Sequence, residues 1–230
     1  MSDPAPNPGL LRSLGRLVRG LSALFWGLPA ALVVCFYTAR AEGFATLGIL
    51  PPLLCTGWLV YGLWNLGAFQ KQERIWRYAL DRAILLGLID LGLSPFLHWS
   101  SQLPGQVFFR LMVLLLAFTG VLFLASLNQV LQRLGAMLPD EALRLEIRQF
   151  TRLNLSLLRT MLVLAILFLA LAQFRGTAFF LGYLFALLDH NTLWFFVPLI
   201  PLVLLPLAMT MAMLWKTKEV ILESIFSAKA

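Results

Sequence analysis

Charged side chains are scarce in this chain of 230 residues. They make up 13% of it, and hydrophobic residues make up 60%. Soluble domains hold about 25% charged and about 45–50% apolar residues, so this composition excludes most soluble folds and intrinsic disorder. The mean hydropathy is +0.84, and several apolar runs approach a length of about 20 residues. The sequence therefore predicts a membrane protein.

Cysteine, histidine and the familiar catalytic motifs are also scarce or absent. Cys35 and Cys55 lie in apolar runs without metal-ligand spacing, and two cysteines exclude a disulfide-rich secreted scaffold. His98 and His190 are far apart and fit no HExxH-like pattern, so we expect no metal site. The sequence contains no G-x-S-x-G, P-loop, G-x-G-x-x-G or C-x-x-C motif. We therefore expect no catalytic residues, no cofactor and no enzymatic activity.

The apolar runs predict an all-α bundle of six membrane spans, arranged as three helical hairpins. Polar segments separate the spans, and the longest of them is the connection 128–154. Between the last two spans, the apolar stretch 178–188 is too short to cross the bilayer and is either re-entrant or interfacial. The spans are predicted at approximately 21–38, 47–69, 79–99, 107–127, 155–174 and 193–214.

Positive charge lies mainly on one side of this predicted topology. The chain has 18 Lys and Arg against 11 Asp and Glu. With a cytoplasmic N-terminus, only Arg40, Arg110 and Arg175 fall outside, and every other Lys and Arg falls inside. The positive-inside rule then predicts that both termini are cytoplasmic, in a multi-pass protein of the bacterial inner membrane. Without span 79–99, the basic segment before it and the basic segment after span 107–127 would lie on opposite sides of the membrane. The charge pattern therefore supports span 79–99.

A cleavable secretory signal is the alternative for the first span. Arginines precede an apolar stretch, and Ala39-Arg40-Ala41 resembles a cleavage site. However, the apolar stretch is longer than the usual signal core of about 7–15 residues, and Phe36 and Tyr37 fit a cleavage region poorly. We expect an uncleaved span, and cleavage would leave five spans in the same orientation.

Basic amphipathic segments occur at both ends of the chain. Residues 1–20 are expected to form a disordered, proline-containing tail and then a helix on the membrane surface. Arg12, Arg16 and Arg19 share one face of this helix. Residues 215–230 form a similar cytoplasmic segment.

The connection 128–154 is the most informative polar segment. Arg144, Arg148 and Arg152 recur at every fourth residue, and apolar residues such as Ile147 line the adjacent face. We expect a surface helix that feeds into the fifth span, with these arginines binding either anionic lipid headgroups or a cytosolic protein. Because the cations of the chain flank apolar runs, lipid explains them more simply than nucleic acid does.

Asp90 is the one ionisable side chain expected well inside the hydrocarbon. Its burial costs a few kcal/mol (about 2.5–3.5 by insertion scales) unless it is protonated, paired or hydrated. Asp90 therefore either marks a path for an ion or solute, or forms a hydrogen bond between helices. Asn65, Asn128 and Thr119 are the candidate partners in neighbouring spans.

Small residues and prolines also mark the spans. Gly27 and Ala31 allow close helix packing in the first span. In the last span Pro198, Pro201 and Pro206 remove amide donors, and they are either tolerated within the bundle or mark a cavity-lining segment.

Two functions fit these features. The first is a non-enzymatic subunit or scaffold of a membrane complex, whose basic cytoplasmic face contacts lipid, other membrane subunits or a cytosolic protein. The alternative is a small-solute or ion transporter or permease component that uses Asp90.

Overall fold

The computed structural model describes residues 8–40, 47–69, 73–137, 141–173 and 192–227. Within them the chain forms helices joined by short turns, without a strand, which confirms the all-α prediction for this part. The predicted short segment 178–188, Arg175 and His190 lie outside the described residues. The helices are α1 (Pro8–Ala39), α2 (Leu50–Leu66), α3 (Arg74–Leu93), α4 (Pro95–Gln102), α5 (Val107–Met137), α6 (Glu141–Gln173) and α8 (Thr192–Ser227).

Three helices in the described part of the chain are long and apolar enough to cross a membrane. They are Arg12–Ala39 in α1, Val107–Met137 in α5 and Arg144–Leu167 in α6. The helix α2 has 17 residues, about 25 Å at about 1.5 Å per residue, and is shorter than the predicted span 47–69. The chain is therefore a membrane protein that is all helical over its described residues, and its six-span topology stays a prediction.

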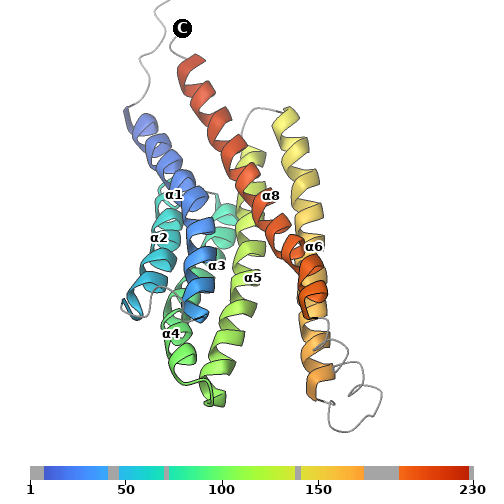
Figure 1. Cartoon of the computed structure of the whole chain (residues 1–230). Helices are drawn as coiled ribbons and strands as arrows, with labels where there is room; N and C mark the ends of the chain where they lie inside the picture. Colours follow the sequence, from blue (N-terminus) through green and yellow to red (C-terminus); the bar gives the residue numbers. More distant parts are fainter. Residues whose placement is uncertain (1–7, 41–46, 70–72, 138–140, 174–191, 228–230) are drawn as a thin grey trace, which may run out of the picture.

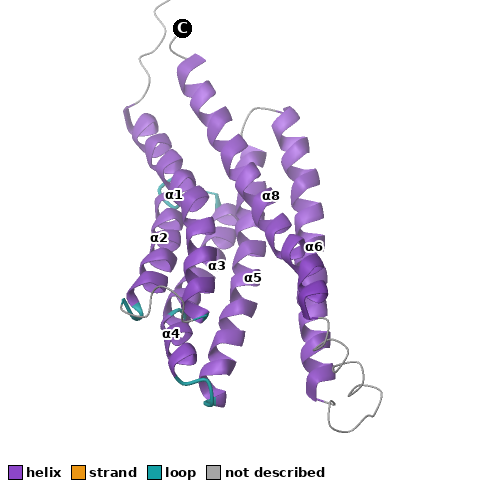
Figure 2. Ribbon diagram, viewed as in Figure 1, coloured by secondary structure: helices purple, strands orange, loops and turns teal. Residues whose placement is uncertain are grey.

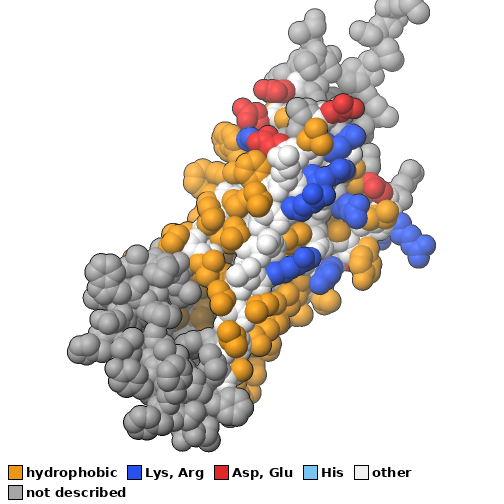
Figure 3. All heavy atoms as spheres, turned by 90° about the vertical axis from the view of Figure 1, so that its right-hand side faces the viewer, with side chains coloured by type: hydrophobic (Ala, Val, Ile, Leu, Met, Phe, Trp, Pro, Cys, Tyr) orange, Lys and Arg blue, Asp and Glu red, His pale blue; other side chains and the backbone are white. Residues whose placement is uncertain are grey.

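The helices pack as a bundle in which consecutive long helices run in opposite directions (Figures 1 and 2). α1 packs mainly against α2, and α3 mainly against α5, while α6 and α8 complete the other side. The start of α1 and the end of α8 lie at the same end of the bundle (Figure 1). We call this end the basic end, because exposed Arg12, Arg16, Arg148, Arg152 and Lys216 lie toward it. Figure 3 shows Lys and Arg gathered on one half of the face formed by α6 and α8.

Glycines allow α1 and α2 to approach closely. A Cβ atom at Gly20 would stand 2.8 Å from the backbone oxygen of Gly62, so a larger residue would push the helices apart. Gly27, from the predicted small-residue pair, instead faces the Leu59 side chain of α2, whose Cδ2 would stand 2.9 Å from an added Cβ atom, and Ala31 is buried one turn further along. Close backbone contact of this kind replaces the hydrophobic effect as a source of helix association inside a bilayer.

The amphipathic segments differ from the prediction. Each continues without a break into its neighbouring apolar run, giving helices α1, α6 and α8 of 32, 33 and 36 residues. These helices are about 48–54 Å long, compared with about 30 Å of hydrocarbon, and they are not separate surface helices. The apolar stripes face the protein instead of lipid, since Leu17, Ile147 and Ile221 are buried in the common core.

The third predicted span, 79–99, is also revised. It is divided between α3 and α4 at Ser94-Pro95, because Pro95 has no amide proton to continue the helix. The backbone oxygen of Leu91, which the missing proton would have bonded, accepts the Ser94 hydroxyl at 2.9 Å instead. A serine therefore satisfies the carbonyl group that the proline leaves open.

Candidate functional site

A cavity of about 390 Å³ lies between the helices. Its walls come from α1, α2, α3, α4, α5, α6 and α8, so both sides of the bundle contribute. Val203 and Leu207, on either side of Pro206, form the α8 wall, as expected if the prolines mark a cavity-lining segment. The α1 residues Leu32 and Phe36 line the cavity yet are 37% and 55% exposed, so it opens on the α1 side.

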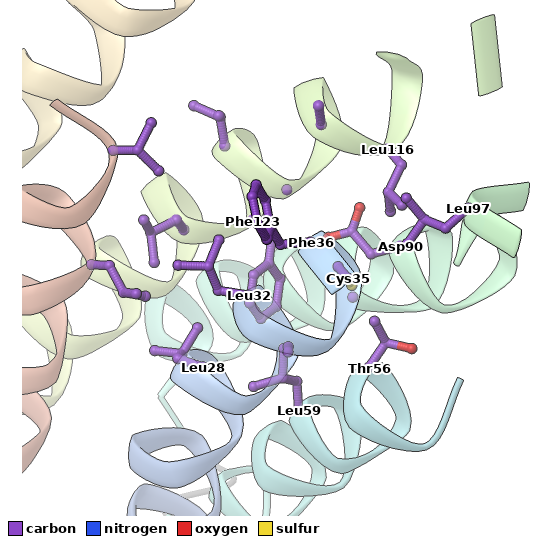
Figure 4. Close-up of a pocket in the computed structure, with 18 of the residues that line it drawn as sticks. Leu28, Leu32, Cys35, Phe36, Thr56, Leu59, Asp90, Leu97, Leu116 and Phe123 are labelled. Carbon is purple, nitrogen blue, oxygen red and sulfur yellow. The ribbon is translucent and has the colours of Figure 1, made fainter. Parts of the chain in front are cut away.

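The walls of this cavity are almost entirely apolar. Asp90, Thr56 and Cys35 are the lining residues with polar or thiol side chains. Asp90 is 8% exposed, and its side chain lies between Cys35, Leu97 and Leu116 in Figure 4. The structure thus places the predicted intramembrane acid in the wall of a ligand-sized cavity. Such a combination of an apolar pocket and one charged group is typical of small-molecule sites.

The Asp90 carboxyl lacks a full set of hydrogen bonds. Its Oδ1 atom is buried without a partner among the described residues. Thr119 of α5, one of the three predicted partners, forms a side-chain hydrogen bond with the Asp90 carboxyl. The Thr119 hydroxyl also lies 2.9 Å from the Leu115 backbone oxygen of its own helix, so Asp90 shares this hydroxyl with a carbonyl group. The Thr56 hydroxyl donates to the Pro52 backbone oxygen at 2.7 Å, as is common for threonine in helices.

The other two predicted partners of Asp90 form hydrogen bonds elsewhere. Asn65, which is partly exposed, donates to the Tyr61 backbone oxygen of its own helix at 2.9 Å. Asn128 is fully buried and belongs to a separate polar cluster. The structure therefore does not bring the three intramembrane polar candidates Asp90, Asn65 and Asn128 into one site.

A polar cluster joins α5, α6 and α8 through Asn128, Asn154 and Thr210, all of which are 0% exposed. Asn154 Nδ2 lies 2.9 Å from Asn128 Oδ1 and 3.0 Å from Thr210 Oγ1. The Thr210 hydroxyl donates to the Pro206 backbone oxygen at 2.7 Å. We did not predict Asn154 or Thr210 from the sequence. The sequence does carry one indication of their role. Each of them lies, like Asn128, inside an apolar run and a few residues from its basic end.

The three arginines predicted to bind headgroups or a partner do not share one environment. Arg148 and Arg152 are exposed on α6, whereas Arg144 is half-buried. Near them, Lys216 of α8 forms an ion pair with Glu146 of α6. Exposed ion pairs of this kind contribute about 0–1 kcal/mol, so this one orients the two helix ends more than it stabilises them.

The remaining chemically reactive side chains do not form a cluster. Among the described residues, no group of three or more His, Cys, Asp or Glu side chains could hold a metal ion. His98 packs its ring against Trp99 with centroids 6.0 Å apart. Cys35 and Cys55 are free thiols.

The chain matches no known protein family, no curated protein and no solved structure. Its function is therefore inferred from its own residues.

The polar cluster predicts a specific loss of stability. Replacing Asn154 with Ala removes the amide that links α6 to α5 and α8, and leaves the buried Asn128 oxygen without its donor. We expect the free energy of unfolding to fall by about 1–2 kcal/mol. The measurement is the unfolding midpoint in mixed micelles with increasing dodecyl sulfate.

The matched control for this variant is Asn65→Ala. It removes the same amide from a partly exposed position where the hydrogen bond stays within one helix, and we expect a change within about 0.5 kcal/mol. Equal losses in the two variants would contradict an inter-helix role for Asn154.

Proposed function

We propose that this chain binds a small, mostly apolar solute within the membrane, as a component of a transporter or permease does. The observation that carries this proposal is the buried Asp90 carboxyl, incompletely hydrogen-bonded, in the wall of an apolar cavity of about 390 Å³. Ligand sites for small molecules are cavities of about 300–1,000 Å³ with few polar groups. An intramembrane acid is costly, and function is a common reason for its presence.

Photolabelling tests whether the cavity takes up a solute. We expect a neutral, apolar aryl diazirine to label residues of the cavity wall, mapped by mass spectrometry of the purified protein. Gly120 lines the cavity, and a Cβ atom added there would have no neighbouring atom within 4 Å, so Gly120→Leu fills the space without a clash at Cβ. This variant is expected to reduce the labelling of Leu116 and Phe123 at least about fivefold, since its side chain occupies the ligand volume.

Gly92→Leu is the matched control, because Gly92 also has open space around it but does not line the cavity. Its labelling pattern should equal that of the unmodified protein. Unchanged labelling in Gly120→Leu would show that the probe reports only contact with the surrounding lipid or detergent, and the proposed binding function would fail.

We further propose the six-span topology with both termini in the cytoplasm of a bacterial inner membrane. The alternating directions of the long helices and the gathering of Lys and Arg toward the basic end support it. Since α1, α6 and α8 are longer than the hydrocarbon is thick, their basic ends extend into the cytoplasmic headgroup region.

Cysteine labelling tests this topology. In a chain without Cys35 and Cys55, we introduce single cysteines at Gly15, Ala136 or Gly105, which have open or exposed positions. A membrane-impermeant maleimide should label Gly105→Cys in intact cells, and should label the other two only after lysis. Labelling of Gly15→Cys or Ala136→Cys in intact cells would contradict the topology.

A second candidate function is docking of a cytosolic protein at the basic end, in the role of a complex subunit or scaffold. The supporting observation is the exposed row of Arg148, Arg152 and Arg159 on α6, at the edge of the bundle. Arginines arranged along one helix face are suited to an acidic partner surface.

Replacing Arg148 and Arg152 together with Gln should remove a protein that co-purifies from native membranes, measured by quantitative mass spectrometry. A decrease of at least about tenfold is expected if these charges are central to the contact. The matched control replaces Arg12 and Arg16, which removes the same charge from α1 at the same end. If both pairs reduce the signal equally, general attraction by positive charge explains the association, and a specific α6 surface does not.

A further inference from the structure

In the part of the chain that the structure describes, the cavity wall contains an acidic side chain, Asp90, without a basic side chain to balance it. None of the described residues that line it is Lys, Arg or His, so no cation in the wall faces Asp90. An isolated carboxylate in apolar surroundings is strongly unfavourable, and a partner that supplies a positive charge offsets this cost most. A ligand cation would supply what the wall does not, and an anion would be repelled.

The rest of the wall is suited to an apolar body on that cation. Leucine, valine and alanine side chains form most of the lining, and they can pack only against an apolar surface. Phe36 and Phe123 also line the cavity, and the Arg40 guanidinium already lies over the Phe36 ring, 5.2 Å from its centroid. Aromatic faces attract organic cations, by about 2 kcal/mol or more when water is excluded.

The opening of the cavity is consistent with such a ligand. Leu32 and Phe36 lie at the mouth, within the membrane-spanning part of α1. A ligand that enters on this side would arrive from the bilayer, near the end of α1. Small inorganic cations do not dissolve there, whereas organic cations whose charge is shielded by apolar groups do.

We propose that the cavity beside Asp90 binds organic cations with an apolar body, such as hydrophobic ammonium or phosphonium ions. This inference rests on the proposed solute-binding function and specifies its ligand class. Asp90 is the charge-recognising residue, while Phe36 and Phe123 contact the apolar groups next to the charge.

Tritiated tetraphenylphosphonium is the probe for this proposal, in scintillation-proximity binding to the purified full chain in lipid nanodiscs. Tetraphenylborate has the same shape and the opposite charge, so its own binding controls for size and hydrophobicity; it is measured in a separate sample, because the two ions form an insoluble salt. We expect saturable binding of tetraphenylphosphonium and no saturable binding of tetraphenylborate. In Asp90→Asn the dissociation constant should rise at least about tenfold, because a charge-assisted contact is lost.

Asp90→Glu keeps the charge and should keep a dissociation constant within about threefold of the unmodified protein, which separates loss of charge from loss of fold. Equal affinity in Asp90→Asn, or saturable binding of tetraphenylborate itself, would overturn the cationic ligand class. If the neutral diazirine still labels the cavity in a Gly120-dependent manner, the solute-binding function stands without it. If neither probe enters the cavity, both the function and the ligand class are wrong.

Discussion

Polar groups buried away from water have to find partners inside the protein, and the packing of these helices depends on how that requirement is met. Asn128, Asn154 and Thr210 satisfy most of it among themselves, and their hydrogen bonds hold α5, α6 and α8 at a fixed register. Ser94 meets the same requirement for the carbonyl group that Pro95 leaves open. Among the described residues, Asp90 Oδ1, Asn154 Oδ1 and Trp76 Nε1 are buried without a partner. Of these three residues Asp90 lines the cavity, so its open carboxyl oxygen belongs to a group that a ligand could reach.

The helical class could be predicted from the sequence, because hydrophobic runs near 20 residues with few charges are typical of helices that cross a bilayer. The ends of the long helices were also predicted well where a run ends abruptly, as at Ala39 and Val107. The cover of the amphipathic segments could not be predicted, because periodicity shows that a helix has an apolar face without showing what covers it. Ile147 and Ile221 face other helices, and lipid would have produced the same pattern in the sequence.

The candidate site was predicted only in part. Asp90 could be selected because an acid within an apolar run is conspicuous. The cavity could not be, because its walls come from seven helices whose leucines resemble every other leucine in the chain. Asn154 was missed for a similar reason. It follows the row of arginines closely in the sequence, and this position suggests that it lies at the polar end of the apolar run. Only the arrangement in space shows that it is buried opposite Asn128.

The continuity of α6 couples two regions that a bent chain would keep independent. One unbroken helix carries Leu158 in the cavity wall and Arg148 near the basic end, about 15 Å apart at about 1.5 Å per residue. A stiff helix transmits a tilt along its whole length, so repacking around an occupant of the cavity would reorient the arginines. Under the proposed function, a molecule in the aqueous phase could then respond to whether the cavity is occupied.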